Sequence, residues 1–185
     1  MKRRRLGKMP MGARQRRGGV AVEMAISIAL MLAMSIGITS IAAAVMSHAR
    51  DMRAVRAGLD LAWQLDTETS APSAAQLDAI AAAMAEIAVD DAAEYGMRAT
   101  VVNADSAGTH GVRWTGTSGD LSVPVRVQID SGAVTVDGAT LTLADDEKLV
   151  VVVWNARRAS SGPIAALGSR DSVLYGVKRD PETGP

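Results

Sequence analysis

The stretch that decides the fold reads Arg14-Gln-Arg-Arg-Gly-Gly-Val-Ala-Val-Glu-Met-Ala-Ile26, and an apolar run continues from it to Met46. The segment from Met24 to Met46 has 23 residues, none of which is charged. At about 1.5 Å of rise per residue, a helix over this segment is roughly 34 Å long, enough to cross a hydrocarbon core of about 30 Å. We therefore predict one transmembrane helix over residues 19–46.

The charges of the chain are divided unevenly around this apolar run. Residues 1–18 carry eight bases and no acid, whereas the remainder carries 12 bases and 20 acids, so that the whole chain is formally neutral. A basic segment before a membrane span favours the cytoplasmic side, so the acidic remainder should lie outside. A basic arm can also bind nucleic acid, but its place beside a span favours a role in topology, and we expect no nucleic-acid partner. Residues 1–18 are interpreted as an unstructured, basic cytoplasmic leader.

The helix is predicted to continue out of the membrane and into solvent over residues 47–66. The segment from Ser47 to Leu65 contains no proline, and its apolar residues recur at helical spacing on one stripe, which consists of Met52, Val55, Leu59 and Trp63. His48 and Asp51 are expected at the membrane boundary, where we interpret the histidine as an ordinary interfacial side chain.

Residues 67–179 are predicted to form an exported α/β head. Ser73 and Gln76 have the spacing of a capping box, and an apolar helical face follows them. We therefore predict a second helix over residues 73–95, which ends near Tyr95 with Gly96 as its stop. From residue 97 onward the apolar residues alternate with a period of two, which is typical of strands.

Four or five strands in an antiparallel meander are predicted for the rest of the head. Asp137-Gly138 is a strong hairpin signal between strands at 134–136 and 140–143. The continuous apolar run at 149–154 indicates a central strand that is covered on both faces. Further strands are expected at 100–103, 121–129 and 172–177. In the second of these, Pro124 favours an edge or a strand start. Loops or turns are expected at 105–111, 145–147 and 159–168, and a flexible tail at 180–185.

The predicted fold class is therefore α+β. A single long N-terminal transmembrane helix extends into solvent, a second helix follows, and an antiparallel sheet of four to five strands comes last. The sheet has one face to cover, and the two helices are the expected cover.

The sequence contains no specific catalytic or metal-binding pattern. There is no cysteine, which excludes disulfides and thiol chemistry, and only two histidines are present. Asp145-Asp146-Glu147 has acidic groups for a hard cation such as calcium, but it lacks the alternate-residue spacing of a calcium loop, so a solvated turn is the preferred interpretation. His110 has no recognisable triad partners. We expect no enzymatic activity, no cofactor and no metal.

A ridge of small residues is predicted along the membrane helix. Its members recur every four residues and would allow another helix to approach closely; they are Ala25, Ala29, Ala33 and Gly37. Ser35 and Thr39 lie on a neighbouring row, from which they can bond across such a contact or back to their own helix carbonyls.

Glu23 is the one residue of this region that requires a partner. A carboxylate at the edge of the apolar run costs up to about 3 kcal/mol if it is drawn to the bilayer centre. Arg16 and Arg17 are near in sequence, but on an intact chain they would stay among the headgroups. Cleavage after Gly18 would create an amino group on Gly19, and that cation would neutralise Glu23 in the same molecule or in a packed neighbour.

These residues resemble the processing site of type IV pilin-like proteins, which has a basic leader, a glycine, four small or apolar residues, a glutamate and an apolar helix. The sequence Arg16-Arg-Gly-Gly-Val-Ala-Val-Glu-Met-Ala25 is particularly similar to TadE-like pseudopilins, minor pilins of the tight-adherence, or Flp, pilus system. The resemblance implies cleavage by a prepilin peptidase after Gly18, which makes Gly19 the first mature residue and Glu23 the fifth. It covers residues 16–45 and departs from the pattern at Met24, where many relatives have phenylalanine.

The resemblance also implies a function in pilus assembly, adherence or secretion. The expected protein crosses the bacterial cytoplasmic membrane once, with its N-terminus in the cytoplasm and its head outside. Its implied partners are the prepilin peptidase, other pilin helices and membrane lipids. The head carries no motif that separates TadE-like from TadF- or TadG-like proteins.

An alternative interpretation is a secreted or membrane-anchored periplasmic binding domain with an ordinary signal sequence or an uncleaved anchor. Ala42-Ala43-Ala44 would then be a small-residue signal-peptidase site that releases Val45 onward. Against this alternative, the apolar run is long for a signal peptide, and Glu23 has no role in it.

Overall fold

The computed structural model describes residues 12–65, 71–88, 94–104, 109–130, 133–144, 147–158 and 170–180. Within these ranges two helices precede seven strands, which confirms the predicted α+β class. The chain divides into two compact units, Met1–Ala44 and Val45–Pro185, and the second unit contains the sheets.

Helix α1 comprises Gly12–Leu65. The backbone is therefore already helical over residues 12–18, which were expected to be unstructured, whereas residues 1–11 lie outside the described ranges. Arginine, glutamine and alanine all have favourable helix propensities, and no proline follows Pro10 in this part, which accounts for the early start.

Helix α2 comprises Ala74–Ala88 and begins with the predicted capping box. The Gln76 amide donates to Ser73 Oγ at 3.3 Å, and the Ser73 amide donates to Gln76 Oε1 at 2.8 Å. The predicted end near Tyr95 is wrong, because Tyr95 lies in strand β1. In that strand Gly96 lies so close to the Leu121 carbonyl that a Cβ would be 2.1 Å from its oxygen, so this glycine serves a close strand contact rather than a helix stop.

Sheet A has the strand order β2-β1-β6-β7, with all neighbours antiparallel. Its strands are β1 (Glu94–Ala104), β2 (His110–Gly119), β6 (Lys148–Arg158) and β7 (Arg170–Arg179). Strand β2 was not predicted, and His110 and Gly111 were assigned to a loop. The strand is rich in glycine and polar residues and lacks a clear apolar alternation, so its pairing with β1, rather than its own pattern, makes it a strand.

Sheet B has the order β3-β4-β5 and consists of Val127–Asp130, Ala133–Val136 and Ala139–Leu141. The predicted hairpin at Asp137-Gly138 is confirmed, since both residues have positive φ (50° and 83°), as a tight type I′ turn requires. Of the predicted strand 121–129 only the last part is extended and paired. Residues 122–126 have no regular structure, which agrees with the missing amide donor of Pro124.

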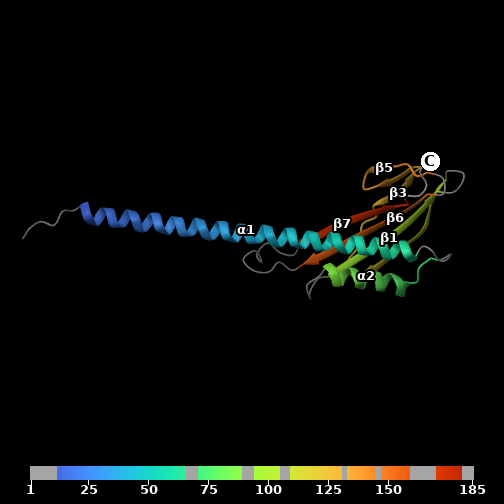
Figure 1. Cartoon of the computed structure of the whole chain (residues 1–185), viewed down its shortest axis with the longest axis horizontal. Helices are drawn as coiled ribbons and strands as arrows, with labels where there is room; N and C mark the ends of the chain where they lie inside the picture. Colours follow the sequence, from blue (N-terminus) through green and yellow to red (C-terminus); the bar gives the residue numbers. More distant parts are fainter. Residues whose placement is uncertain are drawn as a thin grey trace, which may run out of the picture. The chain divides into compact units, whose positions relative to one another are not determined.

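Strand β6 is central and covered on both faces, as predicted. One set of its side chains packs with α1 and α2, and the alternate set packs with sheet B; the two sets are Val150, Val152, Trp154 and Ala156, and Leu149, Val151 and Val153. Figure 1 shows the two sheets and the helices of this unit. The strands thus form two sheets, and sheet A has two covered faces rather than one.

The buried stripe of α1 within the second unit differs in phase from the predicted one. The buried residues are Asp51, Ala54, Val55, Gly58, Leu59 and Ala62, whereas Met52 and Trp63 are only half-buried at the margin. Two of the four predicted residues therefore lie on the stripe. The difference arises because small residues and one carboxylate, which do not count as hydrophobic anchors, face the sheet.

Helix α1 packs tightly against β7 at Gly176. A Cβ at this position would lie 2.6 Å from Leu59 Cδ1 and 2.6 Å from Val55 Cγ1. The absence of a side chain at Gly176 is therefore what lets the two branched side chains of α1 rest on the strand.

Replacement of Gly176 by valine should lower the free energy of unfolding by about 1–3 kcal/mol, since added atoms in a tight contact force neighbours out of place. The measurement is thermal or chemical unfolding of the full chain in detergent. The matched control is Gly111→Val on strand β2, where a Cβ would meet nothing within 4 Å. Equal stability of the two variants would contradict the close packing of α1 on β7.

Candidate functional site

The predicted processing residues lie within helix α1. The backbone of Gly18 is helical, and Gly19 and Glu23 are both exposed. A Cβ at Gly19 would meet nothing within 4 Å, so this part of the helix surface is uncovered. Glu23 lies one turn before Ser27, and both face a shallow surface hollow whose other lining residues are apolar.

The small-residue ridge is exposed over its whole length. Ala25, Ala29, Ala33 and Gly37 all have exposed positions, and a Cβ at Gly37 would meet nothing within 4 Å. A row of this kind offers a smooth surface against which a second helix can pack closely.

The hydroxyl groups beside the ridge bond to the helix itself. Thr39 Oγ1 donates to the carbonyls of Ser35 and Ile36, each at 3.0 Å, and Ser40 Oγ donates to the Ile36 carbonyl at 2.6 Å. Of the two arrangements considered for Thr39, the single chain therefore adopts the internal one. These bonds satisfy the hydroxyls within the helix itself.

The helix that carries these residues is long and apolar enough to span a membrane. Over Gly19–Leu65 its most apolar window has a mean hydropathy of 2.2, and none of that window is buried within the chain. Large apolar side chains of this segment are correspondingly exposed, for example Met31 at 70% and Ile41 at 67%. Exposed apolar surface of this extent is typical of segments that contact a membrane or another protein.

Asp51 forms a buried polar cluster with the head. The residue is only 1% exposed, and both of its carboxylate oxygens receive a guanidinium nitrogen of Arg158, at 2.6 and 2.8 Å. Ser172 Oγ donates to the same carboxylate at 3.0 Å, and Trp154 Nε1 donates at 3.3 Å. Arg158 also donates to the Ala88 carbonyl at the end of α2, at 2.8 Å. This Asp51 cluster joins α1, α2, β6 and β7 through one charge pair.

This cluster was not predicted from the sequence, where Asp51 was expected at the membrane boundary. The signal that was present is the position of Asp51, four residues before Val55 and eight before Leu59, on the apolar stripe. A carboxylate on such a stripe is rare unless it is paired. Its partner Arg158 is 107 residues away, which no local pattern predicts.

A second contact holds the end of α1 that lies at Trp63. Lys148 Nζ lies 4.0 Å from the centre of the Trp63 ring and 3.4 Å from its carbonyl oxygen, and Lys178 Nζ lies 5.3 Å from the same ring. Lys178 also pairs with Asp60 at 2.5 Å. Cations favour both the face of an indole ring and the carbonyl end of a helix, so these lysines fix α1 against β6 and β7.

Glu147 is buried rather than solvated, which corrects the prediction of a solvated turn; Asp145 and Asp146 lie outside the described residues. Glu147 is 2% exposed and forms an ion pair with Arg179, whose Nη2 donates to Oε2 at 2.6 Å. The Ala144 amide donates to the same oxygen at 2.6 Å. Glu147 therefore holds the segment that precedes β6 against β7.

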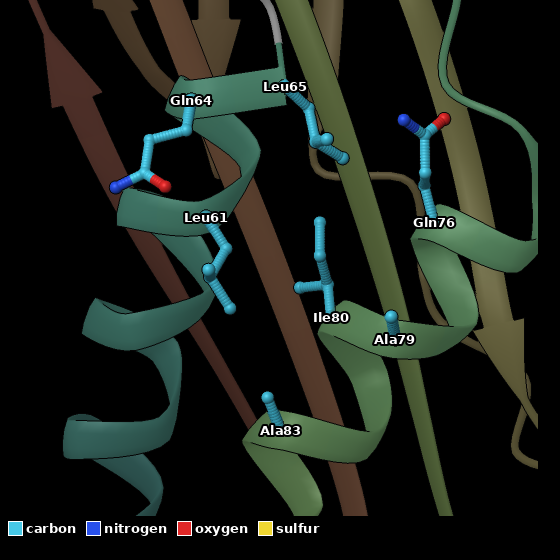
Figure 2. A pocket seen from close by; sticks show the side chains of 7 residues that line it. All are labelled: Leu61, Gln64, Leu65, Gln76, Ala79, Ile80 and Ala83. Carbon is cyan, nitrogen blue, oxygen red and sulfur yellow. The ribbon is translucent and has the colours of Figure 1, made fainter.

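A cavity of about 300 Å³ opens between the end of α1 and helix α2 (Figure 2). Leu61 and Leu65 from α1 and Ile80 from α2 point into the space between the two helices, and Gln76 and Gln64 also line it, although the Gln64 amide points away from α2. The lining is mainly apolar and contains no titratable group. Its lining residues therefore supply no general acid, base or nucleophile.

Among the described residues, no group of three or more histidine, cysteine, aspartate or glutamate side chains is arranged to hold a metal ion. His110 lies at the start of β2, and its two ring nitrogens are buried without a hydrogen-bond partner.

Comparisons of the chain with protein-family models, with curated proteins and with solved structures find no match.

Proposed function

We propose that this chain is a TadE-like pseudopilin, a minor structural or assembly component of a tight-adherence pilus. The observation that carries the proposal is the order of residues around Glu23: clustered bases, the Gly18-Gly19 pair, and a carboxylate at the fifth position of the proposed mature chain, directly before an uncharged apolar run. A prepilin peptidase cleaves after Gly18 in this proposal, and the protein acts through helix packing rather than through catalysis.

The exposure of the N-terminal part of α1 supports this role. Its apolar side chains and its small-residue ridge are uncovered in the single chain, so lipid surrounds them before assembly and other pilin helices pack against them afterwards. The basic residues of the leader favour a cytoplasmic N-terminus, which places the head outside the cytoplasmic membrane.

Glu23 supplies specificity to this packing. Cleavage creates a cation at Gly19, and its attraction to a carboxylate is strong in an environment of low dielectric constant. When the cation and the carboxylate belong to neighbouring subunits, the pair fixes the axial register of their helices.

N-terminal sequencing of the protein extracted from membranes tests the cleavage. We expect the mature chain to begin Gly-Val-Ala-Val-Glu, starting at Gly19. The Gly18→Leu variant should retain its leader, and the matched change Gly37→Leu, farther along the same helix, should still be cleaved. A wild-type chain that keeps Met1, or one that begins at Val45, would contradict the proposal.

A secreted or anchored binding domain is the second candidate, and one observation favours it. The chain divides into compact units after Ala44, so a signal peptidase that cuts there would leave with the head all residues of α1 that are buried within residues 19–65, from Asp51 onward. In that case the mature N-terminus is Val45, and Glu23→Ala leaves export unchanged. The same sequencing experiment therefore separates the two candidates.

A further inference from the structure

We propose that strand β7 is a docking edge, which binds an extended segment of a partner protein as an additional antiparallel strand of sheet A. This inference concerns the head alone and goes beyond the proposed role in pilus assembly. It rests on the free side of β7, on the side chains next to it, and on the charges at its end.

Strand β7 is a regular edge strand of sheet A. It pairs with β6 over ten consecutive residues, from Arg170 to Arg179, without a register shift. On its other side no described strand pairs with it. Edges of this kind present a row of backbone donors and acceptors that another strand can pair with, and proteins usually interrupt them with bulges, prolines or a covering element.

The opposite edge of the sheet is interrupted in this way. Strand β2 has a register shift against β1 between Val101 and Val102, and its Ser118 hydroxyl donates to Asp78 of α2 at 2.7 Å. At Gly116 a Cβ would lie 2.2 Å from Leu77 of α2, so the helix lies directly on this strand. Since α1 lies on β7 at Gly176 in the same way, the two edges differ in regularity rather than in helix cover: among the described strands of sheet A, β7 pairs over ten residues without the register shift that interrupts β2.

An apolar stripe follows β7 on the face of sheet A that carries sheet B. Val173, Tyr175 and Val177 are 38–40% exposed, and their partners on β6 include Val151 and Val153, which are buried under sheet B. Sheet B thus covers β6 but leaves this stripe open. An added strand would place its own alternate side chains beside these three and bury them.

The charges at the C-terminal end of β7 favour a partner strand with an acidic residue at one of its ends, and they thereby favour one orientation of that strand. Lys178 and Arg179 pair with Asp60 and Glu147, yet their side chains remain 37% and 49% exposed. An antiparallel strand continues the alternation of sheet A and brings its N-terminal end beside these cations. The occupant is therefore an extended segment that begins with a carboxylate and continues with alternating β-branched or aromatic residues.

A second copy of this chain fits the edge less well than a bare strand. Helix α1 follows β7 on the other face, with contacts from Asp51 to Ser172, from Leu59 to Gly176 and from Asp60 to Lys178. Paired strands are only about 4.8 Å apart, whereas packed helices need about 8–10 Å between their axes. Two paired β7 strands would each bring an α1 helix to the same face of the joined sheet, whereas an extended segment brings no such helix.

The test measures binding of the synthetic peptide Asp-Thr-Val-Thr-Tyr-Thr-Val-Thr to the full chain in detergent, together with hydrogen exchange of the β7 amides. We expect it to bind at least about tenfold more tightly than the same peptide with proline in place of the central tyrosine, and to slow exchange in β7. The Tyr175→Lys variant should lose this binding, whereas Val112→Lys, a matched change at a 51% exposed position on β2, should retain it.

Three outcomes would overturn the proposal: equal binding of the two peptides, protection of β2 instead of β7, or unchanged binding by a Tyr175→Lys variant. Hydrogen exchange of the wild-type chain keeps the test decisive if that variant fails to fold. Self-association through β7 without peptide would replace the proposed occupant by a second copy. None of these measurements depends on whether the chain is cleaved after Gly18.

Discussion

Replacement of Asp51 by alanine is expected to lower the free energy of unfolding of the head by about 3–5 kcal/mol, which corresponds to a fall in melting temperature of roughly 10–15 °C. The carboxylate is almost completely buried and receives two guanidinium nitrogens, one hydroxyl and one indole N–H. Its removal leaves the charge of Arg158, whose side chain is only 24% exposed, without its counter-ion.

The effect should be larger than the loss of one contact, because Arg158 also holds the end of α2 through the Ala88 carbonyl. Without Asp51, the guanidinium must either stay buried with too few acceptors or turn toward solvent and release that carbonyl. The double variant Asp51→Leu/Arg158→Met removes both charges and should recover part of the lost stability, as is found for buried ion pairs that are replaced by apolar groups.

Asp60→Ala is the matched control. Asp60 lies on the same helix and pairs with Lys178, but its side chain is 63% exposed, so we expect a change of no more than about 1 kcal/mol. Unfolding is followed by heat or by denaturant in detergent. If Asp51→Ala were as mild as Asp60→Ala, the buried cluster would not be the main link between α1 and the head.

Replacement of Glu23 by alanine is expected to abolish assembly while export continues. In the proposed mature protein the carboxylate neutralises the amino group at Gly19, and a charge left unpaired in the membrane costs up to about 3 kcal/mol. That cost corresponds to on the order of a hundredfold in the assembly equilibrium. The assembled protein is measured in the fraction sheared from the cell surface or by cross-linking within the membrane.

Two variants isolate the charge as the cause. Glu23→Asp keeps a carboxylate and should retain part of the assembly, and Ser27→Ala alters the next exposed polar residue on the same face without removing a charge. A phosphatase fused after Asp180 reports export, which should be equal in all variants. Normal assembly of Glu23→Ala would contradict the proposed role of the residue, even if cleavage after Gly18 were confirmed.

Local sequence patterns predicted those parts of the fold whose structure is determined by residues close to one another in the sequence. The capping box at Ser73, the turn at Asp137-Gly138 and the apolar run of β6 each depend on groups close in sequence, and each is confirmed. Strand β2 was missed for the opposite reason, since its glycines and threonines become a strand only through pairing with β1.

The sequence by itself determined that a long apolar helix precedes an α+β head, because uncharged length and periodicity are properties of the chain alone. It also set the order of the bases, Gly18, Gly19 and Glu23, from which the proposed function comes. The tertiary structure alone decided that Asp51 meets Arg158, that Glu147 is buried and that β7 is an edge strand of sheet A among the described strands. These features depend on the order of strands in space and on side chains brought together from distant positions, and no local spacing encodes either.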